Sequence, residues 1–115
     1  MAKAVMLYGI ANCDTVRKAR TWLDASGVAY AFHDYRVEGI ERAKIEAWFA
    51  KAGLDVVLNR QSTTYRALPD AEKAGMTEKK AIALMLDQPT AIKRPVLEMG
   101  ATLLFGFKPE GYAAA

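Results

Sequence analysis

The sequence contains one cysteine and one histidine, and this scarcity excludes several kinds of protein. One cysteine cannot close an internal disulfide, and one cysteine with one histidine cannot supply a structural zinc site, so no metal is expected. Apolar runs stay well short of the roughly 20 residues that span a bilayer. The first six residues lack the long apolar region of a signal peptide. We therefore expect a cytoplasmic protein with no membrane partner.

The charge balance is also moderate. The net charge is +3 over 115 residues, and no long block of Lys and Arg interrupts the chain. Such a composition gives no basic arm for nucleic acid, so direct nucleic-acid binding is not expected. The length suits a single domain.

Hydrophobic spacing predicts a strand, a helix and a second strand in the first third of the chain. Residues 3–8 are mostly apolar without alternation, which indicates a short buried strand. Asn12 is a suitable N-cap for a helix that begins near Cys13 and is ended by Gly27. Residues 28–35 have strand composition, so we expect a βαβ unit with parallel strands.

The rest of the chain is helical first and then returns to strands. Residues 39–88 show helical spacing and no strand signal, and Thr77 is a suitable cap for their last helix. Strand patterns at 95–99 and 102–105 flank a short turn and predict a hairpin, and a helical tail follows. The order βαβ, helical insertion, ββα predicts an α/β fold with a four-stranded mixed sheet.

Cys13 is the residue with the clearest chemical meaning, because it lies where the first strand gives way to the helix. Unpaired backbone N–H groups and the positive end of the helix dipole favour the thiolate, which is the nucleophilic form. The polar neighbours Asn12 and Asp14 argue against a core position, and Arg17 adds positive charge one turn later. A small buried hydrophobe is the alternative interpretation. Val16 stands where a Cys-x-x-Cys motif has its second cysteine, so a catalytic cycle needs an external thiol such as glutathione.

Two arginines and the histidine have open interpretations. Arg94, before Pro95 at the start of a predicted strand, is either a surface residue or an anion ligand, since a guanidinium suits anions with several oxygens. Pro95 can sit at an edge position or follow a cis peptide bond. Arg60 lies in a polar loop that is either merely solvated or part of an anion site. His33 is expected to be a hydrogen-bonded structural imidazole rather than a base.

Five motifs in order along the chain carry a family resemblance. They are Tyr8-Gly9-Ile10-x-Asn12-Cys13-Asp14-Thr15, Phe32-His33-Asp34-Tyr35-Arg36, Leu58-Asn59-Arg60, Leu84-Met85-Leu86-x-Gln88-Pro89 and Ile92-Lys93-Arg94-Pro95-Val96-Leu97. Together they resemble the ArsC-like (arsenate reductase-like) family, in particular its YffB type, which is related to Spx. The resemblance implies a thioredoxin-like fold, formed by residues 1–38 and 89–115, with an inserted helical subdomain at 39–88. It also implies a cis peptide bond before Pro95.

The resemblance carries roles onto some residues and not others. Cys13 matches the nucleophilic cysteine, and Arg60 and Arg94 match two arginines that hold the oxyanion in arsenate reductases. A third such arginine would fall near Gly106-Phe107, where none stands. Gly9 replaces the histidine that precedes the cysteine in those enzymes. Val16 also departs from the Cys-x-x-Cys typical of the related redox-sensing regulators.

We therefore expect a glutathione-dependent thiol or disulfide reductase that acts through Cys13, with no bound cofactor and with glutathione as co-substrate. The expected residues for binding the substrate or glutathione are Asn12, Asp14, Arg17, Arg60, Arg94 and Pro95. Two alternatives stay open. One is an arsenate reductase, and the other is a non-catalytic regulator that binds the RNA polymerase α-subunit, as Spx does.

Overall fold

The computed structural model describes residues 5–100 and 102–114 and divides the chain into two units. The first, which we call the sheet unit, holds the residues up to Gly39 and those from Arg94 onward. The second, which we call the helical unit, is Ile40–Lys93. Each unit is described here by itself.

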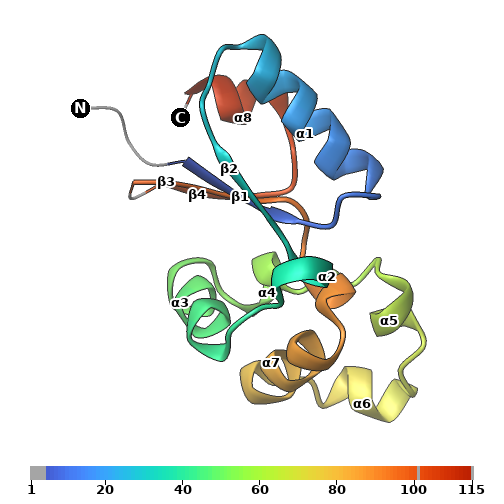
Figure 1. Ribbon diagram of the computed structural model, residues 1–115. Coiled ribbons are helices and arrows are strands. Elements are labelled where there is room, and N and C mark those ends of the chain that lie inside the picture. Colours follow the sequence, from blue (N-terminus) through green and yellow to red (C-terminus); the bar gives the residue numbers. More distant parts are fainter. Residues whose placement is uncertain (1–4, 101, 115) are drawn as a thin grey trace. The chain divides into compact units, whose positions relative to one another are not determined.

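A four-stranded mixed sheet in the order β2-β1-β3-β4 forms the centre of the sheet unit (Figure 1). Its strands are β1 (Val5–Gly9), β2 (Ala31–Asp34), β3 (Val96–Met99) and β4 (Thr102–Phe105). β1 runs parallel to β2, whereas β3 is antiparallel to both β1 and β4. The predicted mixed sheet is thus confirmed. Residues 3 and 4 of the first predicted strand, and Ala101 of the predicted turn, lie outside the described residues.

Helix α1 (Asp14–Ala25) follows β1 and ends as its sequence predicts. It buries one stripe of side chains, formed by Val16, Ala19 and Leu23. Gly27 has a φ of 72°, which a glycine adopts without steric cost. This conformation lets the N–H of Val28 donate to the carbonyl of Leu23 at 3.0 Å, so that the helix is closed by a Schellman-type hydrogen bond.

One face of the sheet, which we call the apolar face, carries the core of the sheet unit. Leu7 of β1 and Leu97 of β3 are register partners and are almost fully buried. They cluster with side chains of α1 and with Tyr112 of helix α8 (Pro109–Ala114). Both helices therefore cover this same face (Figure 1).

The opposite face, which we call the polar face, presents Tyr8, His33 and Glu98. Successive side chains of a strand point to opposite sides, so Tyr8 and Glu98 point away from the neighbours Leu7 and Leu97. Tyr8 and His33 are register partners with ring centroids 5.0 Å apart. The Tyr8 hydroxyl donates a hydrogen bond to Oε1 of Glu98 at 2.9 Å. Polar groups are thus gathered on the face of the sheet opposite α1 and α8.

The helical unit is built from short helices around a small core. They are α3 (Arg42–Ala52), α4 (Leu54–Val57), α5 (Thr63–Arg66), α6 (Asp70–Ala74) and α7 (Glu78–Asp87). The side chains of α3 that are buried in this core are Ile45, Trp48 and Phe49, which follow the predicted helical spacing. Thr77 caps α7, because its hydroxyl accepts the N–H of Lys80 at 3.2 Å. The expected helical character of this region is confirmed.

The helical unit extends past the predicted end of the insertion at residue 88. A 3₁₀ turn, Pro89–Ala91, packs against α5 and α7. The carbonyl of Ala91 accepts the N–H of Asn59 at 2.8 Å, and the N–H of Lys93 donates to Val57 at 2.8 Å. These bonds tie residues 89–93 to the helical unit, so that the chain returns to the sheet unit at Arg94.

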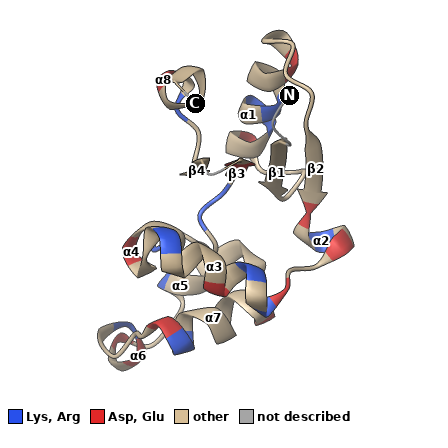
Figure 2. Ribbon diagram, turned by 90° about the vertical axis from the view of Figure 1, so that its left-hand side faces the viewer, with Lys and Arg blue, Asp and Glu red and all other residues tan. Residues whose placement is uncertain are grey.

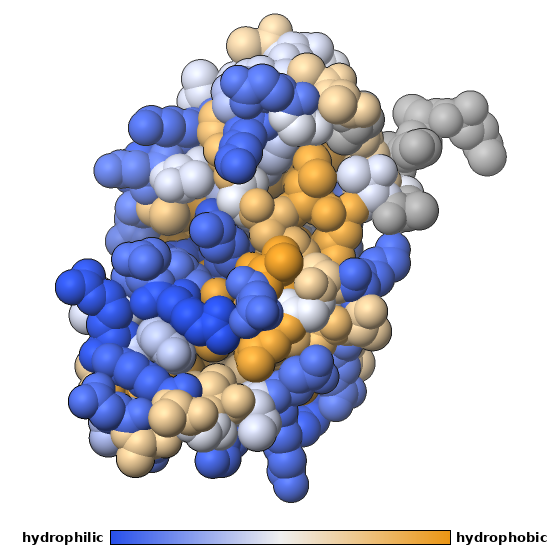
Figure 3. All heavy atoms as spheres, turned by 180° about the vertical axis from the view of Figure 1, so that it is seen from behind, coloured by the Kyte–Doolittle hydropathy of each residue, from blue (hydrophilic) through white to orange (hydrophobic). Residues whose placement is uncertain are grey.

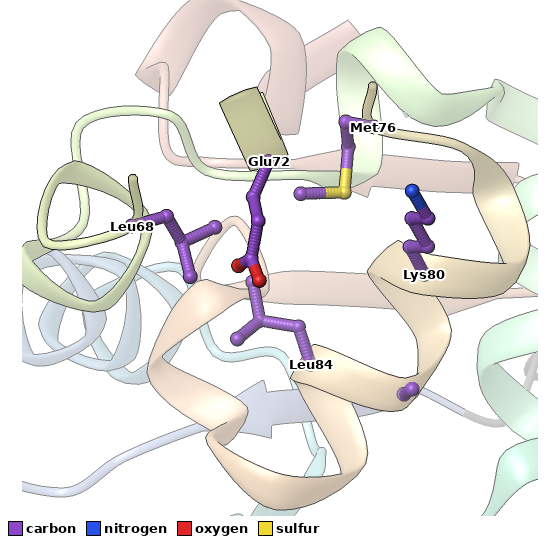
Figure 4. Close-up of a pocket in the computed structure, with 6 residues that line it drawn as sticks. Leu68, Glu72, Met76, Lys80 and Leu84 are labelled. Carbon is purple, nitrogen blue, oxygen red and sulfur yellow. The ribbon is translucent and has the colours of Figure 1, made fainter. Parts of the chain in front are cut away.

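The surface mixes charges of both signs along the helices (Figure 2). Hydrophilic and apolar side chains both reach the surface (Figure 3). Within the helical unit, a hollow of about 260 Å³ is lined by residues that include Leu68, Met76 and Leu84, with Glu72 and Lys80 beside them (Figure 4). None of the described helices is long and apolar enough to cross a membrane.

Candidate active site

The loop after β1 delivers Cys13 to the N-terminus of α1. The N–H of Cys13 donates to the carbonyl of Ile10 at 3.1 Å, and the carbonyl of Cys13 accepts the first helical bond, from Arg17, at 2.9 Å. The backbone of Cys13 is extended, with φ −88° and ψ 128°, and the residue is half-buried. Cys13 is therefore the N-cap itself. The prediction of Asn12 as N-cap was wrong by one residue. Asn12 lies within the turn closed by the Ile10–Cys13 hydrogen bond, and the extended residue before the helix is Cys13.

The first turn of α1 keeps its backbone donors available. N-cap side chains ordinarily accept the N–H groups of the second or third helical residue, here Thr15 and Val16. In α1 the side chain of Cys13, which stands at the N-cap position, makes no such hydrogen bond. A thiolate at the Cys13 position is the natural acceptor for these amides, which also carry the positive end of the helix dipole. The local geometry thus suits a negatively charged sulfur.

Asp14 and Arg17 form an ion pair on the exposed side of α1. The Arg17 guanidinium bonds the Asp14 carboxylate, and their side chains are 57% and 82% exposed. Exposed pairs three residues apart contribute little stability. The positive charge expected from Arg17 beside Cys13 is therefore offset by its own neighbour.

One end of the sheet gathers the Cys13 loop, the end of β2 and the start of β3. Gly9 pairs with Asp34 on one side, and Tyr8 pairs with Val96 on the other. Arg94 and Pro95 immediately precede β3, so they lie at the same end as the loop. The peptide bond between them is cis, as the family resemblance implies.

Asp34 fastens this end of the sheet, although the sequence analysis gave it no role. Its Oδ1 accepts the N–H of Arg36 at 2.9 Å and caps the short helix α2 (Tyr35–Glu38). Its Oδ2 accepts the N–H of Ala11, in the Cys13 loop, at 3.3 Å. A capping-type residue near the end of the predicted strand 28–35 was the available signal.

Tyr35 and Arg94 carry buried polar atoms that lack hydrogen-bond partners. Tyr35 is 3% exposed, and its hydroxyl has no partner among the described residues. The Nε of half-buried Arg94 is likewise buried without one. Burial raises the pKa of Tyr35 well above its usual value, Tyr8 and Glu98 raise this pKa further, and Arg94 opposes the rise. The Tyr35 hydroxyl therefore stays protonated and interacts electrostatically with Arg94.

His33 makes a hydrogen bond to the backbone through one side of its ring. Its Nε2 lies 2.6 Å from the carbonyl of Gly39, and its Nδ1 lies 3.7 Å from Oε2 of Glu38. The expected hydrogen-bonded structural imidazole is confirmed. The bond to Gly39 also fixes the last residue of the sheet unit before the chain enters the helical unit.

Arg60, the other predicted anion ligand, lies in the helical unit in an ordered turn. Its guanidinium pairs with Oδ1 of Asp55 at 3.0 Å, and its side chain is 42% exposed. Hydrogen bonds to Tyr65 and then to Asp55 raise the pKa of Arg60. Ser62 caps α5 by accepting the N–H of Tyr65 at 3.1 Å. The structure therefore gives Arg60 a local partner within its own unit.

A shallow groove of about 600 Å³ begins one residue after Cys13. It runs between the exposed side of α1 and the segment that leads into α8. The residues that line it are Asp14, Arg17, Lys18, Thr21, Trp22, Ala25, Phe107 and Pro109. Phe107 belongs to the dipeptide where a third arginine would fall, and it packs on Tyr112 with ring centroids 4.9 Å apart. An apolar surface thus occupies that position. The described residues include no group of acidic, His and Cys side chains that could hold a metal ion.

Comparison with known proteins gives a family for the chain. A family model described as the ArsC family matches residues 8–115. The structure of a protein named YFFB is 57% identical, with a TM-score of 0.92, and covers 97% of this chain and 98% of its own. An arsenate reductase (ArsC) related protein from Brucella melitensis is 43% identical, with a TM-score of 0.81, over 96% of this chain and 92% of its own.

More distant matches bear on the fold and on the regulators. The glutaredoxin Grx-1 from Archaeoglobus fulgidus has a TM-score of 0.51 at 16% identity, over 99% of this chain and 85% of its own. That likeness concerns the fold alone and agrees with the predicted thioredoxin-like sheet unit. The regulatory protein MgsR of Bacillus subtilis is 25% identical over 111 residues, which cover 95% of this chain and 87% of that protein.

Proposed function

Since the chain belongs to the ArsC family and is related to arsenate reductases, we propose that it is a monothiol reductase that uses glutathione. The observation that carries the proposal is the position of Cys13 as the N-cap of α1, where its side chain makes no cap hydrogen bond. This position supplies backbone donors to a thiolate. The absence of a second cysteine in the sequence makes an external thiol necessary.

The proposed cycle consists of two thiol–disulfide exchanges. The Cys13 thiolate attacks the glutathionyl sulfur of a mixed disulfide, forms a Cys13–glutathione disulfide and releases the substrate as a thiolate. A second glutathione thiolate then attacks the glutathionyl sulfur on Cys13. This step regenerates the Cys13 thiolate and forms oxidised glutathione. Each step breaks one S–S bond and forms another, and glutathione supplies both electrons.

The remaining predicted residues have positioning roles in this proposal. The Asp14 amide and those after it stabilise the sulfur anion, while Asn12 and Pro95 shape the approach to it. Arg94 binds a carboxylate of glutathione, and a guanidinium suits that group by its planar set of donors. Arg17, with its Asp14 partner, lines the groove that would receive the rest of the substrate. Arg60 stays a proposed anion ligand of the helical unit.

The test is a coupled assay in which NADPH and glutathione reductase report oxidised glutathione formed from a cysteine–glutathione mixed disulfide. We expect Cys13→Ser to abolish turnover while circular dichroism shows an unchanged fold. Arg94→Ala should mainly raise KM for glutathione. Turnover that persists in Cys13→Ser would refute the proposal, and an unchanged KM in Arg94→Ala would refute the role of Arg94.

Arsenate is the second acceptor to try in the same assay, because the chain is related to arsenate reductases. Gly9 weighs against it. A Cβ built at Gly9 would lie 2.7 Å from Cγ2 of Val16, so the side chain that those enzymes carry at this position would not fit without movement. Consumption of NADPH that depends on arsenate would establish this alternative.

A regulator that binds RNA polymerase is the alternative of a different class, and the similarity to MgsR favours it. This reading requires no turnover by Cys13. A pull-down with the C-terminal domain of the polymerase α-subunit distinguishes the two functions. Binding without any thiol-dependent activity would replace the reductase with the regulator.

A further inference from the structure

Two tyrosines on the polar side of the sheet unit differ in how their hydroxyls are used. The rings of Tyr8 and Tyr35 stack with centroids 6.5 Å apart. The Tyr8 hydroxyl is bonded to Glu98, whereas the Tyr35 hydroxyl is buried with no partner among the described residues. A buried polar group left unsatisfied costs about 1–3 kcal/mol. The Tyr35 hydroxyl therefore lowers the stability of the fold, and a phenylalanine at this position would not.

The Nε of Arg94 is also buried without a hydrogen-bond partner among the described residues. Arg94 precedes β3 and Tyr35 follows β2, so both lie at the same end of the sheet, where the charge of Arg94 opposes the rise in the pKa of the Tyr35 hydroxyl. The Tyr35 hydroxyl and the Nε of Arg94 do not satisfy each other, since neither atom has a hydrogen-bond partner among the described residues. The Tyr35 hydroxyl and the cationic Arg94 both donate hydrogen bonds. A ligand group that only accepts hydrogen bonds would satisfy both.

We infer that the Tyr35 hydroxyl and the Arg94 guanidinium together bind one carboxylate of the thiol co-substrate, with Tyr35 determining specificity. The inference rests on the proposed function, because it assigns which group of glutathione this site binds. Register places Arg94 at the end of the sheet that also carries the Cys13 loop, and Tyr35 directly follows β2 at that same end. A carboxylate held there accompanies a sulfur delivered to Cys13.

The charges around the pair favour a carboxylate over an inorganic oxyanion. Tyr35 remains a neutral donor, because burial raises its pKa. Glu98 acts on the same hydroxyl with a negative charge, so it opposes a second unit of negative charge nearby. A carboxylate brings one negative charge to Arg94, whereas arsenate or phosphate near neutral pH brings more than one on average. The site is therefore suited to a single negative charge with two acceptor oxygens.

The experiment is calorimetric titration with S-methylglutathione, which keeps both carboxylates and has no reactive thiol. We expect Tyr35→Phe to weaken binding about tenfold, as loss of a hydrogen bond to a charged group requires. Arg94→Lys, which keeps the charge and loses the Nε donor, should also weaken it. Tyr8→Phe is the matched control and should stay within about twofold of wild type. The diethyl ester of S-methylglutathione should bind weakly and equally to wild type and Tyr35→Phe.

Each other outcome overturns part of the account. Equal binding of S-methylglutathione to wild type and Tyr35→Phe, or no binding to either, would overturn the inference. Arsenate binding that depends on Tyr35, without binding of S-methylglutathione, would overturn the assignment to a carboxylate. Because the probe has no thiol, Tyr35-dependent binding without turnover in the coupled assay would uphold the inference and refute the proposed reductase. Turnover with Tyr35-independent binding would do the reverse.

Discussion

The two faces of the sheet differ in the chemistry of the groups that they bury. On the apolar face Leu7 and Leu97 pack against α1 and α8 and have no polar groups to satisfy. On the polar side the Tyr35 hydroxyl and the Nε of Arg94 are buried and have no hydrogen-bond partner among the described residues. The contrast indicates that the apolar face supplies stability, whereas the polar side is organised for a ligand.

The largest stability effect should come from the apolar face. Leu97→Ala removes a buried side chain from the centre of the core and should lower the free energy of unfolding by about 2–5 kcal/mol. Leu104→Ala, on a partly buried neighbour of the same cluster, is the control and should cost less. Urea denaturation measures both. The folded variants should retain Cys13-dependent turnover, and a loss of turnover without a loss of stability would break the division between the faces.

The junction between β1 and α1 should give the next largest effect. Gly9→Ala places a methyl group against Val16 and should cost about 1–3 kcal/mol, because a packed site has little room to adjust. Val16→Ala removes the obstructing methyl groups. In a double-mutant cycle the combined variant should therefore be more stable than the sum of the two single changes predicts. Simple additivity would contradict the close approach seen at Gly9.

The dependence of stability on alkaline pH tests the burial of Tyr35. An unfolded tyrosine ionises near pH 10, about its ordinary pKa, whereas burial raises the pKa of Tyr35 in the folded chain. Above about pH 10 the unfolded chain thus binds fewer protons than the folded one, and stability falls as the pH rises. Tyr35→Phe should flatten this decline by about 1.4 kcal/mol per pH unit. An unchanged slope in denaturation at several alkaline pH values would show that Tyr35 is solvated.

The smallest effect separates the two stacked tyrosines near neutral pH. Tyr8→Phe breaks the bond to Glu98 and should lower the free energy of unfolding by about 1 kcal/mol. Tyr35→Phe removes a hydroxyl that has no partner, so stability should stay the same or rise by up to about 1 kcal/mol. Thermal denaturation of both variants measures the difference in sign. A destabilised Tyr35→Phe would indicate a structural role for this hydroxyl and weaken the ligand interpretation.

The sequence was informative where a residue type has one local purpose. Gly27 at the end of α1, Thr77 before α7 and the position of Cys13 at the strand–helix junction followed from propensity and spacing. The N-cap was misplaced by one residue, because Asn12 and Cys13 both fit and the Ile10–Cys13 turn decides between them. Strand and helix patterns also do not mark where a folding unit ends: the insertion was expected to end at about residue 88, and the helical unit continues to Lys93.

The polar side of the sheet was beyond sequence reasoning for a physical reason. Tyr8, Tyr35, Arg94 and Glu98 come from four separate places in the chain, and their proximity depends on strand order and register. Aromatic residues in strands ordinarily indicate packing, and a tyrosine that lacks a hydrogen bond looks the same in sequence as one that has it. The family motifs did include Tyr35, but they carried no role for it.

The most direct test of the central claim is intact-mass measurement after incubation with oxidised glutathione and then with excess reduced glutathione. The account predicts one glutathionyl group on the wild-type chain, none on Cys13→Ser, and full removal of the group by reduced glutathione with release of oxidised glutathione. Alkylation by iodoacetamide serves as the control that the thiol can be reached. A Cys13 that iodoacetamide alkylates but that never accepts a glutathionyl group would contradict the account.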